Sequence, residues 1–164
     1  GGGDRVATLS GFVRFREDAP NAVDAALALL DEGVEADPGD LPGGPLTGPV
    51  PGSLDIEPDE EVEKVGRTTG HTRGRITAVE VDGVAVQYDR SVLTFDDQVE
   101  IEGLPGSFSA GGDSGSVIWR SRDRAPLALL FAGSDTGGST GAGVTFASPL
   151  ATVLQAVSGE WVSG

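Results

Sequence analysis

Glycine and proline set the strongest constraint on how this chain can fold. The 164 residues include 26 glycines and 10 prolines, and both residue types are unfavourable in the interior of a helix. Turn-forming residues at this frequency fit an all-β domain in which short strands are joined by tight turns. Aromatic residues make up only 5% of the chain, so the core must be built mainly from valine, leucine, alanine and isoleucine.

Short apolar segments rich in β-branched residues predict about ten antiparallel strands, and a barrel fits them better than a sandwich. The segment 23–30 is expected to be a buried strand, and Asp82-Gly83 between two strands predicts a tight hairpin. Apolar residues at 150, 153, 154 and 157 follow a helical period and predict a C-terminal helix, with Pro149 at its start. The expected strands lie at 5–16, 23–30, 46–50, 62–65, 75–81, 84–88, 99–101, 116–119, 127–132 and 144–147.

The net charge of the chain argues against nucleic acid as a partner. Acidic residues outnumber basic ones by 26 to 11, giving a net charge of −15, whereas nucleic-acid binding needs clustered cations. Such acidity fits either a halophilic protein, because net charge keeps proteins soluble, or an arginine-biased genome.

No apolar run is long enough to span a membrane. With no cysteine, one histidine and no calcium-loop or phosphate-loop spacing, we expect neither a metal nor a cofactor.

The segment Gly112-Asp113-Ser114-Gly115 is the sharpest chemical signal. A nucleophilic serine must sit on a tight turn, with its hydroxyl exposed and backbone N–H groups directed at the oxyanion that forms during attack. Glycines on both sides of the serine permit such a turn. The same pattern is also compatible with an ordinary loop between two strands. The sequence around the motif must therefore distinguish a nucleophile turn from such a loop.

The order of elements around this motif resembles the end of the second barrel in chymotrypsin/trypsin-like serine proteases, in particular the bacterial trypsin-like and glutamyl-endopeptidase-like branch. Two apolar strands, a glycine-rich loop, a further strand and a helix follow Ser114. Upstream, the segment 21–26 around Asp24 is similar to the one that carries the triad aspartate. The segment 64–74, which includes Gly66-Arg-Thr-Thr-Gly70, resembles the loop that opens the second barrel.

The resemblance implies an all-β, chymotrypsin-like fold with a partial first barrel and irregular connection in residues 1–57. Residues 58–164 would form a complete second barrel and a C-terminal helix. It further implies that Ser114 is the nucleophile, that Asp24 orients the base, and that the N–H groups of Gly112 and Ser114 form the oxyanion hole. Asp113 would point inward and hold the loop. The substrate-binding residues it implies are Phe108, Ser109, Ala132, Gly133 and Ser134.

The departure from the family pattern is the absence of a histidine before Asp24. Without an imidazole, a serine hydroxyl is a weak nucleophile. The only histidine, His71, lies between Asp24 and Ser114, where we expect a loop residue, a substitute base being the alternative.

We therefore expect the C-terminal piece of a serine endopeptidase that cleaves peptide or protein substrates. It would be a processed fragment whose catalytic histidine comes from outside this chain. The alternative is an inactive protease-fold module that binds peptides. The expected partner is the N-terminal fragment of the same precursor or a second copy, because an incomplete first barrel exposes apolar residues and strand edges. The apolar residues expected on this face are Val6, Leu9, Phe12, Val13 and Phe15.

Overall fold

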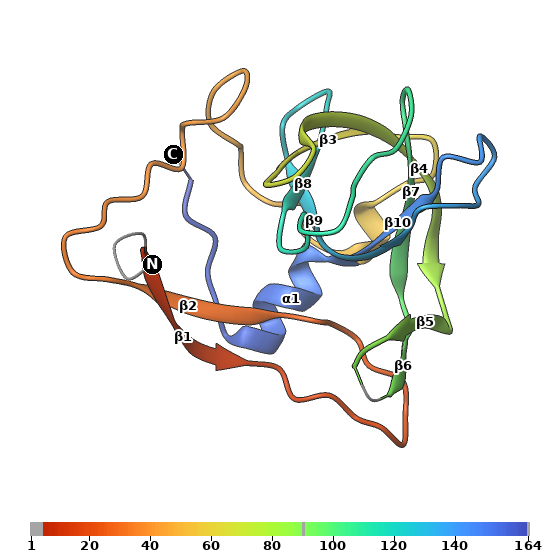
Figure 1. Cartoon of the computed structure of the whole chain (residues 1–164). Coiled ribbons are helices and arrows are strands. Elements are labelled where there is room, and N and C mark those ends of the chain that lie inside the picture. Colours follow the sequence, from red (N-terminus) through yellow and green to blue (C-terminus); the bar gives the residue numbers. More distant parts are fainter. Residues whose placement is uncertain (1–4, 90, 164) are drawn as a thin grey trace.

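A closed antiparallel barrel forms the body of the molecule. The computed structural model describes residues 5–89 and 91–163. Six strands close the barrel in the order β10-β7-β4-β3-β8-β9 (Figure 1). Its interior is filled by small and medium aliphatic side chains, among them Val62, Ile76 and Ile101, which are fully buried. The barrel strands are β3 (Glu61–Gly66), β4 (Gly70–Val81), β7 (Gln98–Gly103), β8 (Val117–Arg120), β9 (Pro126–Ser134) and β10 (Val144–Pro149).

Two hairpins and a helix lie outside the barrel. Strands β1 (Ala7–Phe12) and β2 (Ala26–Leu30) pair only with each other, as do β5 (Val84–Gln87) and β6 (Val92–Phe95). Helix α1 (Leu150–Val157) follows β10 directly, and a single turn of 3-10 helix, η1 (Ser53–Asp55), interrupts the long connection after β2. The all-β prediction, with a complete barrel and a C-terminal helix over 150–157, is confirmed.

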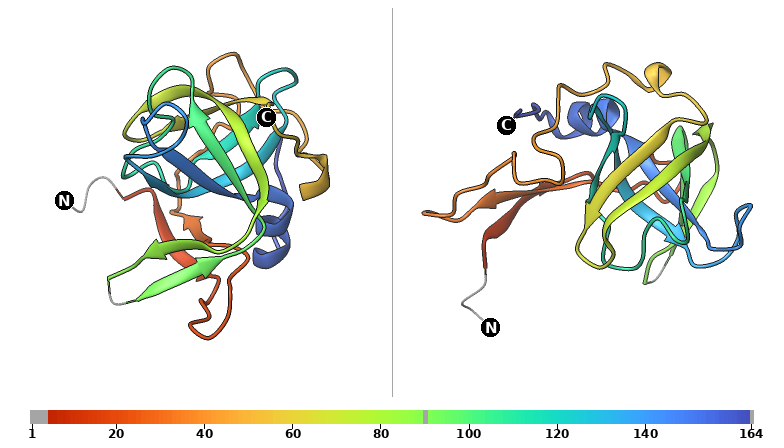
Figure 2. Two further views of the ribbon diagram at one scale, coloured as in Figure 1. Left: turned by 90° about the vertical axis from the view of Figure 1, so that its right-hand side faces the viewer. Right: turned by 90° about the horizontal axis from the view of Figure 1, so that it is seen from above.

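The β1–β2 hairpin projects to one side of the barrel, and the connection that follows β2 runs on the same side (Figures 1 and 2). All five residues of β2 are exposed, so the prediction of a buried strand over 23–30 is wrong for most of its length. Only Val23 and Ala25 are buried, against Leu150 and Val153 of α1. The division of the chain at residue 57 stays a prediction.

The connection between β4 and β5 differs from the predicted hairpin. Asp82 and Gly83 do join two strands, and Gly83 has the expected positive φ of 70°, but β4 pairs with β7 while β5 pairs with β6. The Asp96 carboxylate accepts from the Gly83 N–H at 2.8 Å, and the Asp82 carboxylate accepts from the Asp97 N–H at 3.0 Å. These bonds hold the two connections together, so the chain leaves the barrel at this point and does not fold back on β4.

Residues 46–50, where a strand was predicted, form no strand. Leu46 and Val50 are both buried, and the Val50 N–H donates to the Pro126 carbonyl at 2.9 Å. The segment therefore covers the start of β9 through one backbone bond and two apolar side chains. The predicted strand is wrong here because the prolines and glycines around these residues prevent a continuous ladder.

Candidate active site

Ser114 lies on a tight turn between β7 and β8 that is anchored to β9. The Gly115 N–H donates to the Leu130 carbonyl at 2.7 Å, and the Leu130 N–H donates to the Ser116 carbonyl at 3.0 Å. Gly112 and Gly115 adopt φ angles of +100° and +90°, which a residue with a side chain rarely adopts. The Ser114 side chain is exposed, and its hydroxyl donates to the Phe131 carbonyl at 3.2 Å. The turn thus presents a serine hydroxyl on the surface, as the motif predicted.

The two N–H groups expected to bind an oxyanion are free in this turn. Within residues 5–89 and 91–163, neither the Gly112 N–H nor the Ser114 N–H donates a hydrogen bond to another protein group. Backbone donors left unpaired near an exposed serine are the arrangement that an oxyanion hole requires. The assignment of Gly112 and Ser114 to this role stays a prediction.

The Asp113 carboxylate points into the protein beneath the Ser114 turn and is 1% exposed. It accepts hydrogen bonds from the N–H groups of Thr68, Thr69 and Ala110 and from the Thr69 hydroxyl, at 2.7 to 3.2 Å. Burial opposes ionisation of this carboxyl and is the largest single influence, but the hydrogen bonds together outweigh it and hold its pKa well below the usual range. An ionised Asp113 therefore ties the turn to the loop between β3 and β4.

Lys64, the only lysine of the chain, supplies the counter-charge to Asp113. Its ammonium lies 3.4 Å from Asp113 Oδ2, both side chains are 0% exposed, and it donates to the Thr69 hydroxyl at 2.6 Å. Burial lowers the pKa of Lys64, while Asp113 acts in the opposite direction. Gly66 gives the pair its space, since a Cβ atom there would lie 2.4 Å from Asp113 Oδ1.

No role was predicted for Lys64. The available signal was that the sole lysine of an acidic chain lies within a predicted strand, next to Val65.

Asp24 is held against the barrel by the residues that precede it. The Asn21 N–H donates to the Thr94 carbonyl at 2.8 Å, and the Gln98 side-chain amide donates to the Ala22 carbonyl at 2.9 Å. The Tyr88 hydroxyl donates to Asp24 Oδ2 at 2.7 Å. Burial raises the pKa of Tyr88, and the Asp24 carboxylate raises it further, so Tyr88 is a stable hydrogen-bond donor. Nothing in the sequence pointed to Tyr88, which lies 64 positions from Asp24.

Asp24 and Ser114 border one cavity of about 300 Å³. Ala25, Leu129 and Phe131 complete much of its wall. The fold therefore brings together the two residues that the resemblance paired as nucleophile and orienting acid, although they are far apart in sequence.

A second, smaller cavity of about 80 Å³ lies on another side of Ser114. Four of the five predicted substrate-binding residues line it, namely Ser109, Ala132, Gly133 and Ser134. Phe108, the fifth, does not: its side chain is 1% exposed and belongs to the core cluster of the barrel. Phe108 instead supports the site from within, because its ring lies 5.5 Å from the Lys64 ammonium.

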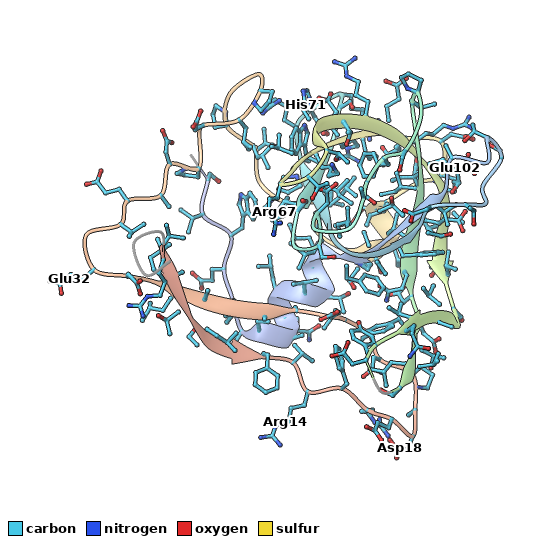
Figure 3. The ribbon with its side chains drawn as sticks, viewed as in Figure 1. Arg14, Asp18, Glu32, Arg67, His71 and Glu102 are labelled. Carbon is cyan, nitrogen blue, oxygen red and sulfur yellow. The ribbon has the colours of Figure 1, made fainter. Side chains whose placement is uncertain are left out.

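A third cavity of about 440 Å³ lies beyond Gly112 and Ser114, beside the connection after β2. Trp119 and Trp161 contribute to its lining, together with Leu41 and Arg67. Figure 3 shows Arg67 on the side of the barrel that faces this connection. Nothing in the sequence predicted this cavity.

His71 lies on β4, directly across from Val65 of β3, and not in the loop where it was expected. Its Nε2 lies 2.6 Å from Glu63 Oε2, and its ring stacks on Trp119 with centroids 6.0 Å apart. Burial opposes ionisation of Glu63, but the hydrogen bond with His71, aided by Arg73, keeps its pKa below the usual value. His71 lines none of the three cavities that Ser114 borders (Figure 3), so its position gives no support to the substitute-base alternative.

The described residues show neither a metal-binding cluster nor a membrane-spanning helix. In the part of the chain that the structure describes, no group of three or more acidic, histidine or cysteine residues could hold a metal ion. Across residues 5–89 and 91–163, no helix has both the length and the apolar character needed to cross a membrane.

Solved structures with the same architecture are bacterial serine proteases, and the fold of this chain is chymotrypsin-like. Cellulomonas bogoriensis chymotrypsin superimposes with a TM-score of 0.63 at 22% identity, over 94% of this chain and 74% of that one. Thermobifida fusca protease A gives a TM-score of 0.63 at 20% identity, over 88% and 70% of the respective chains.

A glutamic acid-specific serine protease, which uses a histidine triad in substrate binding, also gives 0.63, at 22% identity, over 96% and 74%. No protein-family model matches the sequence, and no curated protein is similar to it.

Proposed function

We propose that this chain is the nucleophile-bearing part of a serine endopeptidase that hydrolyses peptide bonds by acyl transfer through Ser114. The observation that carries the proposal is the cavity of about 300 Å³ bordered by both Ser114 and Asp24. A serine that lies on a glycine-rich turn by chance is not expected to border the same cavity as a carboxylate held by a hydrogen bond. It is also not expected to lie beside two unpaired N–H groups.

The chemistry follows from the positions of these groups. An imidazole in the cavity would accept the Ser114 proton as Oγ attacks the peptide carbonyl, and it would later give that proton to the leaving amine. Asp24 would accept a hydrogen bond from the other ring nitrogen and stabilise the imidazolium, while Tyr88 holds the carboxylate in place. The Gly112 and Ser114 N–H groups would bind the carbonyl oxygen as its charge develops. Water would then hydrolyse the acyl-enzyme by the same route.

The imidazole would come from a second polypeptide segment, because the one histidine of this chain is held by Glu63. The exposed β1–β2 hairpin favours a partner that docks beside this site. Leu9, Phe12 and Leu29 are 63%, 62% and 70% exposed, and both outer strand edges lack a partner within the part of the chain that the structure describes. Strands that pair with these edges would cover the apolar residues. We propose the histidine-bearing fragment of the same precursor as this partner, with a second copy of the chain as the other candidate.

A peptide-binding module without catalysis is the second candidate function. It is favoured by one observation, that the Ser114 hydroxyl is engaged by the Phe131 carbonyl and not by a base. Such a module would use the same turn and cavities without bond cleavage.

Chemical rescue separates the two functions on the chain as it stands. A fluorophosphonate probe reacts with serines whose hydroxyl is activated by a base, and free imidazole is small enough to enter a cavity of about 300 Å³. We expect labelling of Ser114 to be slow alone and to rise with imidazole concentration towards saturation. Ser114→Ala should abolish the label, and Asp24→Asn should weaken the rescue. Asp59→Asn, at a carboxylate that is 83% exposed and remote from the site, is the matched control.

Labelling that does not respond to imidazole, or that maps to another residue, would contradict the endopeptidase proposal and leave the binding module. Labelling that rises with imidazole equally in the wild-type and Asp24→Asn chains would show that Asp24 takes no part in the activation of Ser114.

A further inference from the structure

The cavity of about 80 Å³ beside Ser114 defines the side chain that can lie before the scissile bond. It contacts Ser114 and is walled by Ser109, Ala132, Gly133, Ser134 and Asp135. Three cavities border Ser114, and this is the one lined by the predicted substrate-binding residues, so it is the place where the residue on the acyl side of the bond would insert. This inference rests on the proposed function, since it concerns the same site.

The volume of the cavity limits the size of that side chain. A dry cavity of about 150 Å³ holds one benzene molecule, so a space of about 80 Å³ accommodates a side chain smaller than an aromatic ring. An aromatic ring, or the full length of an arginine, exceeds that space. The walls are also well supported, which opposes enlargement. Ser139 donates two hydrogen bonds to the buried Glu102, from its N–H at 2.7 Å and from its hydroxyl, and these bonds lower the pKa of Glu102. They hold the loop after β9 to the barrel (Figure 3).

The polar groups of the cavity give no reason to bind a charged side chain. The Ser109 hydroxyl is paired with the Thr145 hydroxyl at 2.6 Å, and the Ser134 hydroxyl donates to the Thr136 carbonyl at 2.6 Å. No arginine, lysine or histidine lines the cavity, so a carboxylate would lose its hydration without gaining a counter-charge. Asp135 is the only charged residue in the wall, and it is exposed, where water and salt screen its charge.

We propose that this site selects a small aliphatic residue, such as alanine or valine, immediately before the scissile bond. It would reject glutamate, arginine and aromatic residues at that position. The glutamic acid-specific protease of the same fold uses a histidine triad in substrate binding, whereas no histidine of this chain lines the cavity.

Product-like peptides test the proposal without any catalytic base. A short peptide that ends in the selected residue can place its carboxylate against the free N–H groups and its last side chain in the cavity. We would measure the dissociation constants of peptides that are identical except for a C-terminal Ala, Val, Phe, Arg or Glu. We expect the Ala and Val peptides to bind at least about tenfold more tightly than the others, the scale on which small apolar pockets discriminate.

Two variants refine the result. Gly133→Ala places a methyl group 3.1 Å from the Val144 carbonyl oxygen and 3.4 Å from the Ser109 hydroxyl oxygen, and it should weaken binding of the Val peptide more than that of the Ala peptide. Gly48→Ala, whose added methyl meets nothing within 4 Å, is the matched control and should change neither. The ranking on the wild-type chain alone decides the main question if the Gly133 variant does not fold.

Tightest binding of the Phe or Glu peptide would overturn the proposal. So would tight binding of the Arg peptide that Asp135→Asn abolishes, because Asp135 would then set a preference for a cation. Failure of every peptide to bind at millimolar concentration would also overturn it. These outcomes are separate from the endopeptidase proposal, which the imidazole-dependent labelling of Ser114 tests independently of the residue in the cavity.

Discussion

Replacing Lys64 with methionine is the most direct test of how the Ser114 turn is held. The substitution keeps most of the side-chain length and removes the charge that faces Asp113 at 3.4 Å inside the protein. At that separation the attraction is about 5 kcal/mol for an effective dielectric constant of about 20, and part of it is offset by the cost of burying the ammonium. Removal of one member of a buried ion pair costs about 3–5 kcal/mol.

Asp113 keeps four hydrogen-bond donors in the variant, so we expect the lower end of that range, a loss of about 3 kcal/mol. For a chain of this size, this corresponds to a fall in Tm of roughly 6–12 °C. Chemical denaturation followed by tryptophan fluorescence measures the free energy of unfolding directly, because Trp119 is buried in the same barrel.

The control is Arg75→Met, which breaks an ion pair with Asp59 on the barrel surface, where the two side chains are 45% and 83% exposed. It should cost less than about 1 kcal/mol. In the double variant with Asp113→Asn, the Lys64→Met change should cost less than it does alone, because the unpaired charge is gone. A Lys64→Met chain as stable as the Arg75→Met chain would refute the view that the buried pair supports the turn.

Four shorter predictions follow from the same structure. Gly66→Ala should destabilise the fold by about 1–3 kcal/mol, since its Cβ would lie 2.4 Å from Asp113 Oδ1. A Gly66→Ala chain with the same free energy of unfolding as the Gly48→Ala chain would contradict this. The pKa of Asp113 is lowered in the folded chain, so its stabilising contribution is complete above the unfolded carboxyl pKa of about 3.9 and is lost as pH falls towards the folded pKa. The stability difference between wild type and Asp113→Asn should therefore shrink below about pH 4. With a net charge of −15, Tm should rise as salt increases from low to molar concentration, and a flat response would argue against halophilic adaptation. Light scattering of the isolated chain should show association, because Leu9 and Phe12 are more than 60% exposed; a monomer that unfolds sharply would contradict it.

Local patterns predicted the parts of the fold that depend on local chemistry. The glycines around Ser114 permit positive φ angles, and the apolar period of 150–157 fits one helix face, so both elements appear where the sequence predicted them. The Asp82-Gly83 turn shows the limit of this reasoning. Its backbone conformation is as expected, but the pairing of β5 with β6 depends on carboxylates 13 and 15 positions away.

Contacts between distant residues account for what the sequence analysis missed at the site. Tyr88 reaches Asp24, and Thr68 and Thr69 reach Asp113, only because the fold brings segments that are distant in the sequence together. Each of these residues has an ordinary surface role in most strands and loops, so its type carries no signal. The exposure of β2 was missed for a related reason, since an apolar strand is buried only when another element covers it.

The Ser114 turn and the Asp24 segment are both held by contacts within this chain. These contacts determine what a partner that brings the missing base would need to contribute. The Ser114 turn is held by the Lys64–Asp113 pair and by β9. The Asp24 segment is held by Asn21 and by Gln98, which lies at the start of β7. Asp24 lies in the connection between β1 and β2, but these contacts are made with residues outside that hairpin. We therefore expect Ser114, Asp24 and Gly112 to keep their relative positions when a partner covers the outer edges of the hairpin. A docking segment would therefore need to bring only an imidazole and strands that pair with the exposed edges, without rearranging the residues already in place. That is the physical reason to expect free imidazole to activate Ser114 in the isolated chain.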